Sequence, residues 1–305
     1  MQRHRTLVLL LAAGLTSSIA LAQAAEAPAK PVLPAGVQPK PAPAPEAPAS
    51  PVADKNLPSG KEVLERYVEK TGGRAAHEKV VARVVHGFME MPARNIKAAY
   101  TLNQAAPNKY RMTIEIPGMG KFDEGSDGTT TWGMDLMQGP RVVEGEELEQ
   151  KSRAMAFNAD LEPQEHWKTI DTVGIEAVKG KPAYKVLLTP EKGAATTNFY
   201  DVESGLLVRT VAVQKMAMGD VPTDTEVSAY KEFEGVKVST LQILMVLGME
   251  QRMTMENVTH PEKVADEVFA LPPEIKALVE KKAAAPAEKV EPKTAEPVKD
   301  APKGG

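Results

Sequence analysis

Alternating apolar and polar residues constrain the fold of this chain more than any other feature of its sequence. In the segment 110–116, Tyr110, Met112, Ile114 and Ile116 occupy every second position, and polar residues stand between them. In Leu241–Met255, seven of the eight odd positions are apolar. A period of two places one face of a β-strand on a core, whereas an amphipathic helix repeats every 3.6 residues. The pattern favours one strand here, or two strands bent near Gly248.

Turn signals divide the rest of the domain into further hairpins. Strand patterns follow the turn at 180–182, flank the turn at 201–205 and lie on both sides of Gly235. Helical patterns are fewer. Ser59 and Glu62 form a capping-box pattern, and the helix that they begin ends at Gly72 and Gly73. Further helices are expected at 75–81, 144–157 and 273–281. The sequence therefore predicts an α+β domain that consists mainly of antiparallel strands.

The first 25 residues have the layout of a secretory signal peptide. Arg3 and Arg5 precede the apolar run 7–15, and small residues follow at 20, 22 and 24. We expect cleavage after Ala22 or Ala24 and a periplasmic location. The alternative is an uncleaved anchor, although the apolar run is shorter than the roughly 20 residues of a membrane-spanning helix. After cleavage we expect no integral membrane span.

Two tails of biased composition enclose the predicted domain. Residues 26–58 include ten prolines and predict a Pro/Ala-rich disordered linker, and residues 283–305 predict a disordered Ala/Lys/Pro tail. The domain is expected at 59–282. The chain has no cysteine, which excludes disulfides, thiol chemistry and a lipid-bearing cysteine anchor.

Charge and motif content argue against several functional classes. Residues 59–282 hold 28 Lys and Arg against 34 Asp and Glu, a net charge of −6, and form no basic stripe, so we expect no nucleic-acid partner. The five histidines lack ligand spacing, and no nucleophile elbow or phosphate loop occurs. We therefore expect no metal, no cofactor and no catalytic residue. A hydrolase with catalytic groups distant in sequence stays open.

Methionine marks the candidate ligand-binding residues. Thirteen of the fourteen methionines lie in the predicted domain, and this unbranched, polarizable side chain adapts to irregular apolar partners. The methionines either fill a core or line an apolar cavity, and the sequence leaves both possibilities open. The candidates for an apolar cavity are Met112, Ile114, Leu241, Ile243, Met245, Leu247, Met249, Met253 and Met255.

The order of several short phrases resembles the LolA/LolB-like superfamily of periplasmic outer-membrane lipoprotein-sorting proteins. The phrases are the helix 63–71 with its two glycines, Asp127–Trp132, Gly180–Leu188, Asp201–Arg209, Tyr230–Lys237 and Val268–Pro272. The resemblance implies a curved, incomplete β-barrel closed by helices around an apolar cavity for lipid or acyl chains. Val238 and Ser239 stand where relatives often have a proline, and the two tails are not part of the usual carrier.

Together these features predict an exported, non-enzymatic binding protein that shields lipid or acyl chains, with a role in outer-membrane lipoprotein sorting as its most specific form. The expected partner is a lipid or an acylated lipoprotein. The alternative is a periplasmic sensor or regulatory module of the same fold that binds lipid or an envelope protein.

Overall fold

The computed structural model describes residues 56–135, 138–157, 159–216 and 219–284. The predicted signal peptide 1–25, most of the predicted linker 26–58 and most of the predicted tail 283–305 lie outside the described residues. The last helix continues to Ala284, so the first two residues of that predicted tail are helical.

Thirteen strands form one antiparallel sheet with the order β6-β5-β4-β3-β2-β1-β13-β12-β11-β10-β9-β8-β7. Strands that follow one another in sequence pair in the sheet, except β6 and β7, and the pairing of β1 with β13 joins the first and last strands. The strands are β1 Ala82–Met91, β2 Ile96–Ala105, β3 Lys109–Ile116, β4 Gly120–Ser126, β5 Thr131–Asp135, β6 Gly139–Val142, β7 Thr169–Val178, β8 Lys181–Thr189, β9 Thr196–Asp201, β10 Leu207–Met216, β11 Gly219–Phe233, β12 Val236–Val246 and β13 Met249–Thr259.

In the residues that the structure describes, four α-helices accompany the sheet, namely α1 Gly60–Lys70, α2 Arg74–His77, α3 Gly145–Met155 and α4 Pro273–Ala284. Three 3-10 turns lie at Pro92–Arg94, Pro163–Glu165 and Asp266–Phe269. The predicted capping box is present. The Ser59 hydroxyl accepts from the Glu62 amide at 3.2 Å, and the Glu62 carboxylate accepts from the Ser59 amide at 2.7 Å. The helix predicted at 75–81 is shorter than expected, because α2 ends at His77 and β1 begins at Ala82.

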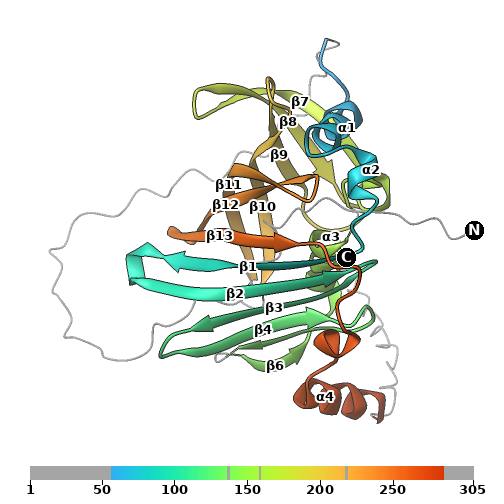
Figure 1. Cartoon of the computed structure of the whole chain (residues 1–305), viewed down its shortest axis with the longest axis vertical. Helices are drawn as coiled ribbons and strands as arrows, with labels where there is room; N and C mark the ends of the chain where they lie inside the picture. Colours follow the sequence, from blue (N-terminus) through green and yellow to red (C-terminus); the bar gives the residue numbers. More distant parts are fainter. Residues whose placement is uncertain (1–55, 136–137, 158, 217–218, 285–305) are drawn as a thin grey trace, which may run out of the picture.

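The strongly curved sheet has an inner and an outer face (Figure 1). We call inner the face against which α1 and α3 pack. Val63, Leu64 and Tyr67 of α1 pack on Val186 and Leu188 of β8. The inner face of β1 to β4, β12 and β13 carries a second apolar cluster that includes Met155 at the end of α3. The edges of the sheet are β6 and β7. The sheet is therefore an open, incomplete barrel with α1 and α3 on its inner side, as the family resemblance implies.

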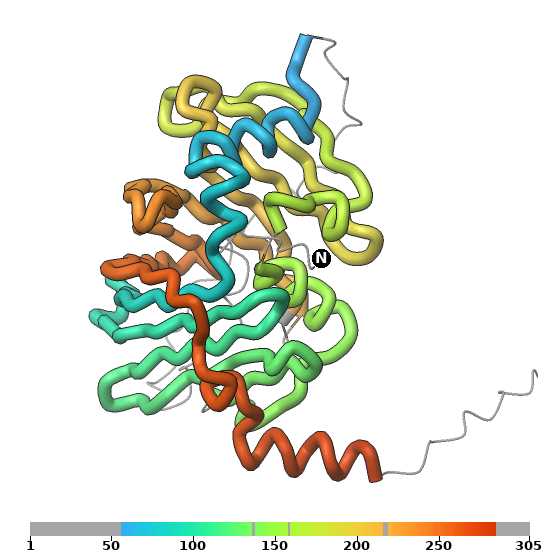
Figure 2. Tube along the Cα trace, turned by 45° about the vertical axis from the view of Figure 1, so that its right-hand side comes forward, coloured from blue at the N-terminus to red at the C-terminus, as the bar shows by residue number. Residues whose placement is uncertain are grey.

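The segment after β13 crosses the outer face (Figure 2). Val264 and Phe269 pack against Ala82 of β1, and α4 contacts β6 at the lower edge. Within the described residues, no helix is both long enough and apolar enough to cross a membrane.

A two-residue turn at Leu247 and Gly248 separates β12 from β13. Both residues have positive φ angles, 50° and 74°, which is the backbone of a type I′ hairpin turn. Val246 pairs with Met249 and Gln242 pairs with Met253, so the residues that share a face change from even numbers in β12 to odd numbers in β13. The predicted bend near Gly248 is therefore a tight hairpin, and the apolar stripe of odd positions is divided between two faces.

Candidate functional site

Six methionines gather on the inner face of the sheet and form what we call the methionine cluster. They are Met89, Met91, Met112, Met155, Met253 and Met255, and each is buried. Val85, Leu102, Ile114 and Phe157 pack among them. The cluster joins β1 to β4 with β13, and α3 adds Met155. Because methionine adapts to irregular apolar partners, a ligand could be accommodated in this region with small side-chain adjustments.

The nine predicted ligand-binding residues fall into two groups. Four of them, Met112, Ile114, Met253 and Met255, belong to the methionine cluster region of the inner face. Met249 has the inner-face parity of β13 and is half-buried beside the turn. Leu241, Ile243 and Met245 lie on the outer face of β12, opposite Thr254, Arg252 and Glu250. Leu247 occupies the hairpin turn and is exposed. The structure thus brings together the candidates from β3 and β13, and it separates them from those of β12.

Buried polar atoms without a protein partner lie next to the methionine cluster. Arg83 of β1 faces Gln104 of β2, which in turn faces Tyr110 of β3. All three side chains are buried on the inner face. Among the described residues, Arg83 Nη1 and Nη2, Gln104 Oε1 and the Tyr110 hydroxyl have no hydrogen-bond partner. The Tyr100 hydroxyl, two rows further along the same face, also lacks one within the described residues. Most buried polar groups in proteins are hydrogen-bonded, so a set of unpaired neighbours is unusual.

Arg83 is the most unusual member of this set. It is 1% exposed, and its Nε donates to His260 Nε2 at 3.3 Å. The Phe157 ring lies 6.0 Å from the guanidinium carbon. Burial lowers the pKa of Arg83 to about 10, so the side chain is still charged at neutral pH. Burial also lowers the pKa of His260 to about 4, with the Arg83 charge acting in the same direction, so this partner is neutral. Arg83 is thus a buried cation beside a neutral partner.

The cluster under α1 contrasts with this region, because its tyrosine hydroxyls are paired. The Tyr67 hydroxyl donates to that of Tyr230, which donates to the Leu207 carbonyl at 2.8 Å. The Tyr200 hydroxyl accepts from Asn198 Nδ2 at 3.1 Å. Tyr67 and Tyr200 also make an edge-to-face contact with ring centroids 5.5 Å apart. The tyrosine hydroxyls of this part of the inner face are thus paired as in an ordinary core, although Oδ2 of the neighbouring Asp160 has no partner among the described residues.

Polar contacts hold α3 over the inner face. Lys151 Nζ lies 2.6 Å from Glu124 Oε2 in a buried ion pair. Burial raises the pKa of Glu124, and the Lys151 charge opposes this rise. Gln150 of α3 donates to the Val213 carbonyl and accepts from the Lys215 amide of β10. The buried residues of α3 are Lys151 and Met155, so Met155 is the apolar side chain by which this helix packs on the sheet.

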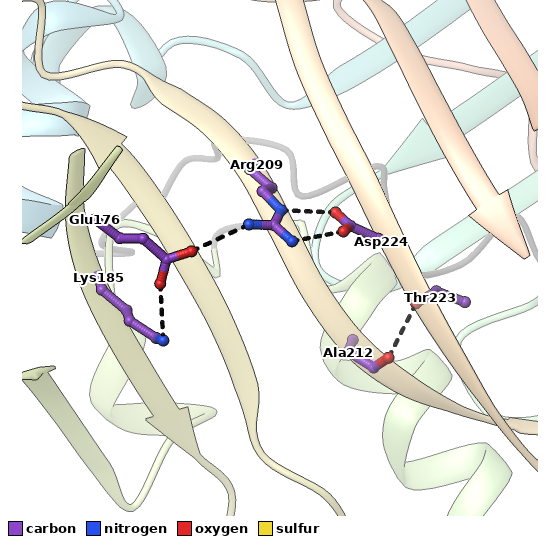
Figure 3. A network of polar contacts seen from close by, with 6 residues as sticks. All are labelled: Glu176, Lys185, Arg209, Ala212, Thr223 and Asp224. Carbon is purple, nitrogen blue, oxygen red and sulfur yellow. Dashed lines mark hydrogen bonds and ion pairs between the residues drawn. The ribbon is translucent and has the colours of Figure 1, made fainter. Parts of the chain in front are cut away.

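An open groove of about 380 Å³ lies on the outer face, between the β7–β8 hairpin and β12. Arg209 binds Asp224 through two hydrogen bonds of 2.8 and 2.6 Å and reaches Glu176 at 3.3 Å (Figure 3). Lys185 donates to the same Glu176 at 3.0 Å. The pKa of Arg209 is raised, chiefly by its hydrogen bonds to Asp224. The groove is lined by Ala177, Val178, Lys179, Arg209, Asp224, Glu226, Ile243, Met245 and Glu250. Two predicted residues, Ile243 and Met245, therefore line a groove in which the arginine is neutralised by carboxylates of the same sheet.

A smaller groove of about 260 Å³ separates α1 from the segment 160–164. Asp160 at its base is buried, and its Oδ2 has no partner in the described part of the chain. Burial raises the pKa of Asp160 to about 8. Exposed charged side chains form the rim, including Lys61, Glu65 and Arg74.

In residues 56–284, outside the gaps at 136–137, 158 and 217–218, no group of three or more His, Asp or Glu side chains is arranged to hold a metal ion. The expectation that the protein uses no metal or cofactor stays a prediction.

The sequence pattern did not reveal the unpaired polar row. Arg83 lies in the segment Val80-Val81-Ala82-Arg83-Val84-Val85, where an isolated arginine suggests a solvent-exposed position. One signal was present, because Arg83 has the parity of Val85 and Met89, which face the core. Gln104 shares the parity of Leu102 in the same way.

No protein-family model matches the chain, and no curated protein matches it. The structure is similar to a DUF1329 family protein from Desulfovibrio piger, at 12% identity and a TM-score of 0.49 over 69% of this chain and 95% of that one. A LolA superfamily protein from Nitrosomonas europaea is 11% identical with a TM-score of 0.49, and the match covers 70% and 99% of the two chains. An outer membrane lipoprotein-sorting protein domain from Vibrio parahaemolyticus is 9% identical with a TM-score of 0.47 over 69% and 95%.

Proposed function

We propose that the domain binds lipid or acyl chains at the methionine cluster, between α3 and the inner face of the sheet, and that it does so as an exported, non-enzymatic protein. The observation that carries the proposal is the contrast on the inner face. The tyrosine hydroxyls under α1 are paired, whereas several buried polar atoms beside the methionine cluster have no partner among the described residues. A region that must accept another molecule has a reason to leave such groups unpaired, and a permanent core does not.

The packing around α3 supports the same location. Met155 is the buried apolar side chain of this helix, and its other buried residue, Lys151, is held by an ion pair. An acyl chain that replaced the Met155 and Phe157 contacts would bury apolar surface at roughly 0.8 kcal/mol per methylene. The adaptable methionines could adjust to chains of different length. In its most specific form the proposal is a carrier in outer-membrane lipoprotein sorting within the periplasm.

The methionines themselves offer the test. In protein labelled with ¹³C at the methionine methyl groups, a spin-labelled fatty acid should broaden the signals of Met112, Met253 and Met255, which lie on the inner face. The signals of Met119 and Met245 are matched controls, because both side chains are exposed outside the cluster.

Broadening confined to the two exposed methionines would place the ligand on the outer surface and overturn the proposed site. If no methionine signal responded, and mass spectrometry of gently purified protein found no lipid, binding of acyl chains itself would be refuted.

A further inference from the structure

We infer that Arg83 is the head-group site of the proposed binding region and that the preferred ligands are anionic amphiphiles, with the anionic oxygens on Arg83 and the apolar chain along the methionine cluster. The inference rests on the proposed function and adds the chemical class of the ligand. Such a head-group site requires a cation that faces the interior, lacks a counter-charge and lies within reach of the methionine cluster.

The missing counter-charge is the first argument. In the described part of the chain, Arg83 forms no ion pair with a carboxylate, and both of its terminal nitrogens lack a hydrogen-bond partner. Arg83 instead contacts His260 and the Phe157 ring, and it interacts electrostatically with Tyr67. His77 is a further cation-forming group near His260. A buried, uncompensated charge is costly, and an anionic ligand would remove that cost.

The geometry of the free nitrogens is the second argument. Because Nε is used by His260, the two free atoms are Nη1 and Nη2. These two nitrogens point from one carbon as a fork, and such a fork matches two oxygens of a carboxylate or a phosphate. Gln104, which faces Arg83 across the β1–β2 pair, has an unpaired Oε1. That oxygen can accept from a hydroxyl next to the anionic group.

The position along the strand is the third argument. Arg83, Val85 and Met89 share the inner face of β1. Met89 is six positions after Arg83, which corresponds to about 20 Å along a strand. A chain that starts at Arg83 and runs along β1 would therefore pass Val85 and end among the methionines. The polar and apolar parts of an amphiphile would each meet a matching part of the inner face.

Arg209 provides a matched contrast. It has the same side chain and lies in the same sheet, but on the outer face, where Asp224 and Glu176 already occupy its nitrogens. An added anion would have to displace these carboxylates. We therefore assign anion binding to Arg83 and none to Arg209.

Calorimetric titration of the full-length protein with laurate, lauryl phosphate and lauryl alcohol tests the inference. We expect both anions to bind at least roughly 10-fold more tightly than the alcohol, as one charge-assisted hydrogen-bonded contact would give. Arg83→Met should remove this preference while the alcohol still binds. Arg83→Lys keeps the positive charge but not the two neighbouring N–H donors, so it should lose part of the preference for anions. Arg209→Met should keep the whole preference. Circular dichroism would establish that each variant is folded.

The remaining outcomes separate the two proposals. Equal binding of all three amphiphiles, unchanged in Arg83→Met, would overturn the head-group site and leave acyl binding in place. If none of the three bound, the proposed function would fail as well. Acetate and inorganic phosphate, titrated alone, distinguish a lipid head group from a free anion. Tight binding of either, with no gain from the lauryl chain, would assign Arg83 to a small anion and overturn the inference.

Discussion

Arg83 and Arg209 lie on opposite faces of one sheet and meet opposite electrostatic surroundings. On the outer face, Arg209 forms a network with Asp224, Glu176 and, through Glu176, Lys185. On the inner face, Arg83 has a neutral histidine at 3.3 Å and two nitrogens without a partner in the described part of the chain. The charges of the outer network are paired with one another, whereas the inner guanidinium meets no carboxylate among the described residues. The difference suggests that the inner face serves binding and the outer network serves stability.

The strongest test of this difference uses a buried ion pair and an accessible one. Lys151→Met would leave Glu124 buried without a counter-charge, and we expect a loss of about 3–5 kcal/mol in the free energy of unfolding. Lys185→Met breaks the half-exposed contact to Glu176 on the outer face and should cost about 1 kcal/mol or less. Urea denaturation measures both.

The double variant Lys151→Met, Glu124→Leu is the control for the inner pair. It should recover most of the loss, because both charges are removed together. If Lys151→Met and Lys185→Met cost the same, the inner pair would not be isolated from solvent, and the contrast between the faces would fail.

Met253 and Met245 test the same contrast with one residue type. They lie in the two strands of one hairpin, but Met253 is 2% exposed and Met245 is 41% exposed. Met253→Ala should lower stability by about 2–5 kcal/mol through the lost contacts and the cavity that remains. Met245→Ala should change it by less than about 0.5 kcal/mol. Thermal unfolding of the pair checks the result, and a larger effect at Met245 would contradict the assignment of faces.

The same hairpin shows which structural features the sequence predicts and which it does not. Alternation predicts strands at 241–255, and the structure has them, because a period of two reports burial of one face of each strand. The face itself depends on the turn. A two-residue turn at Leu247 and Gly248 reverses the parity, so Met245 and Met253 lie on opposite sides. Leucine rarely adopts a positive φ angle, so a leucine at position 247 does not predict this turn.

The helix α1 was predictable for a local reason, because Ser59 and Glu62 cap it through contacts three residues apart. Arg83 was not, since its surroundings come from His260 and Phe157, which are distant in sequence. Local sequence signals therefore predicted most of the helices and strands. The unpaired row beside the methionine cluster depends on strand pairing between distant segments.

Asp160 extends the comparison to the α1 side of the inner face through its dependence on pH. Its pKa is about 8 in the folded protein, raised by burial, against about 3.9 in an unfolded chain. Between these values the folded state retains a proton that the unfolded state releases, so stability should fall as the pH rises from about 4 to about 8. The titratable groups that face Asp160 are Tyr67, Tyr200 and Tyr230.

We expect Asp160→Asn to remove this slope and to raise stability at pH 8 by on the order of 2 kcal/mol relative to the wild type. Glu65→Gln, on the exposed rim of the same groove, should leave the slope unchanged. Thermal unfolding between pH 5 and pH 8 measures it. A wild-type profile that is flat over this range would show that Asp160 is hydrated and not part of the buried core.

The smallest expected effect returns to the two arginines and compares the direction of the change. Without ligand, Arg83→Met replaces an uncompensated buried charge by an apolar side chain of similar length, so we expect a gain of about 1 kcal/mol in stability. Arg209→Met removes contacts to two carboxylates on a partly exposed side chain and should lose about 1 kcal/mol. Opposite signs in urea denaturation would separate a residue kept for binding from one kept for stability. A loss at both positions would mean that Arg83 is a structural residue, and saturating laurate, which should stabilise the wild type more than Arg83→Met, would then stabilise the two proteins equally.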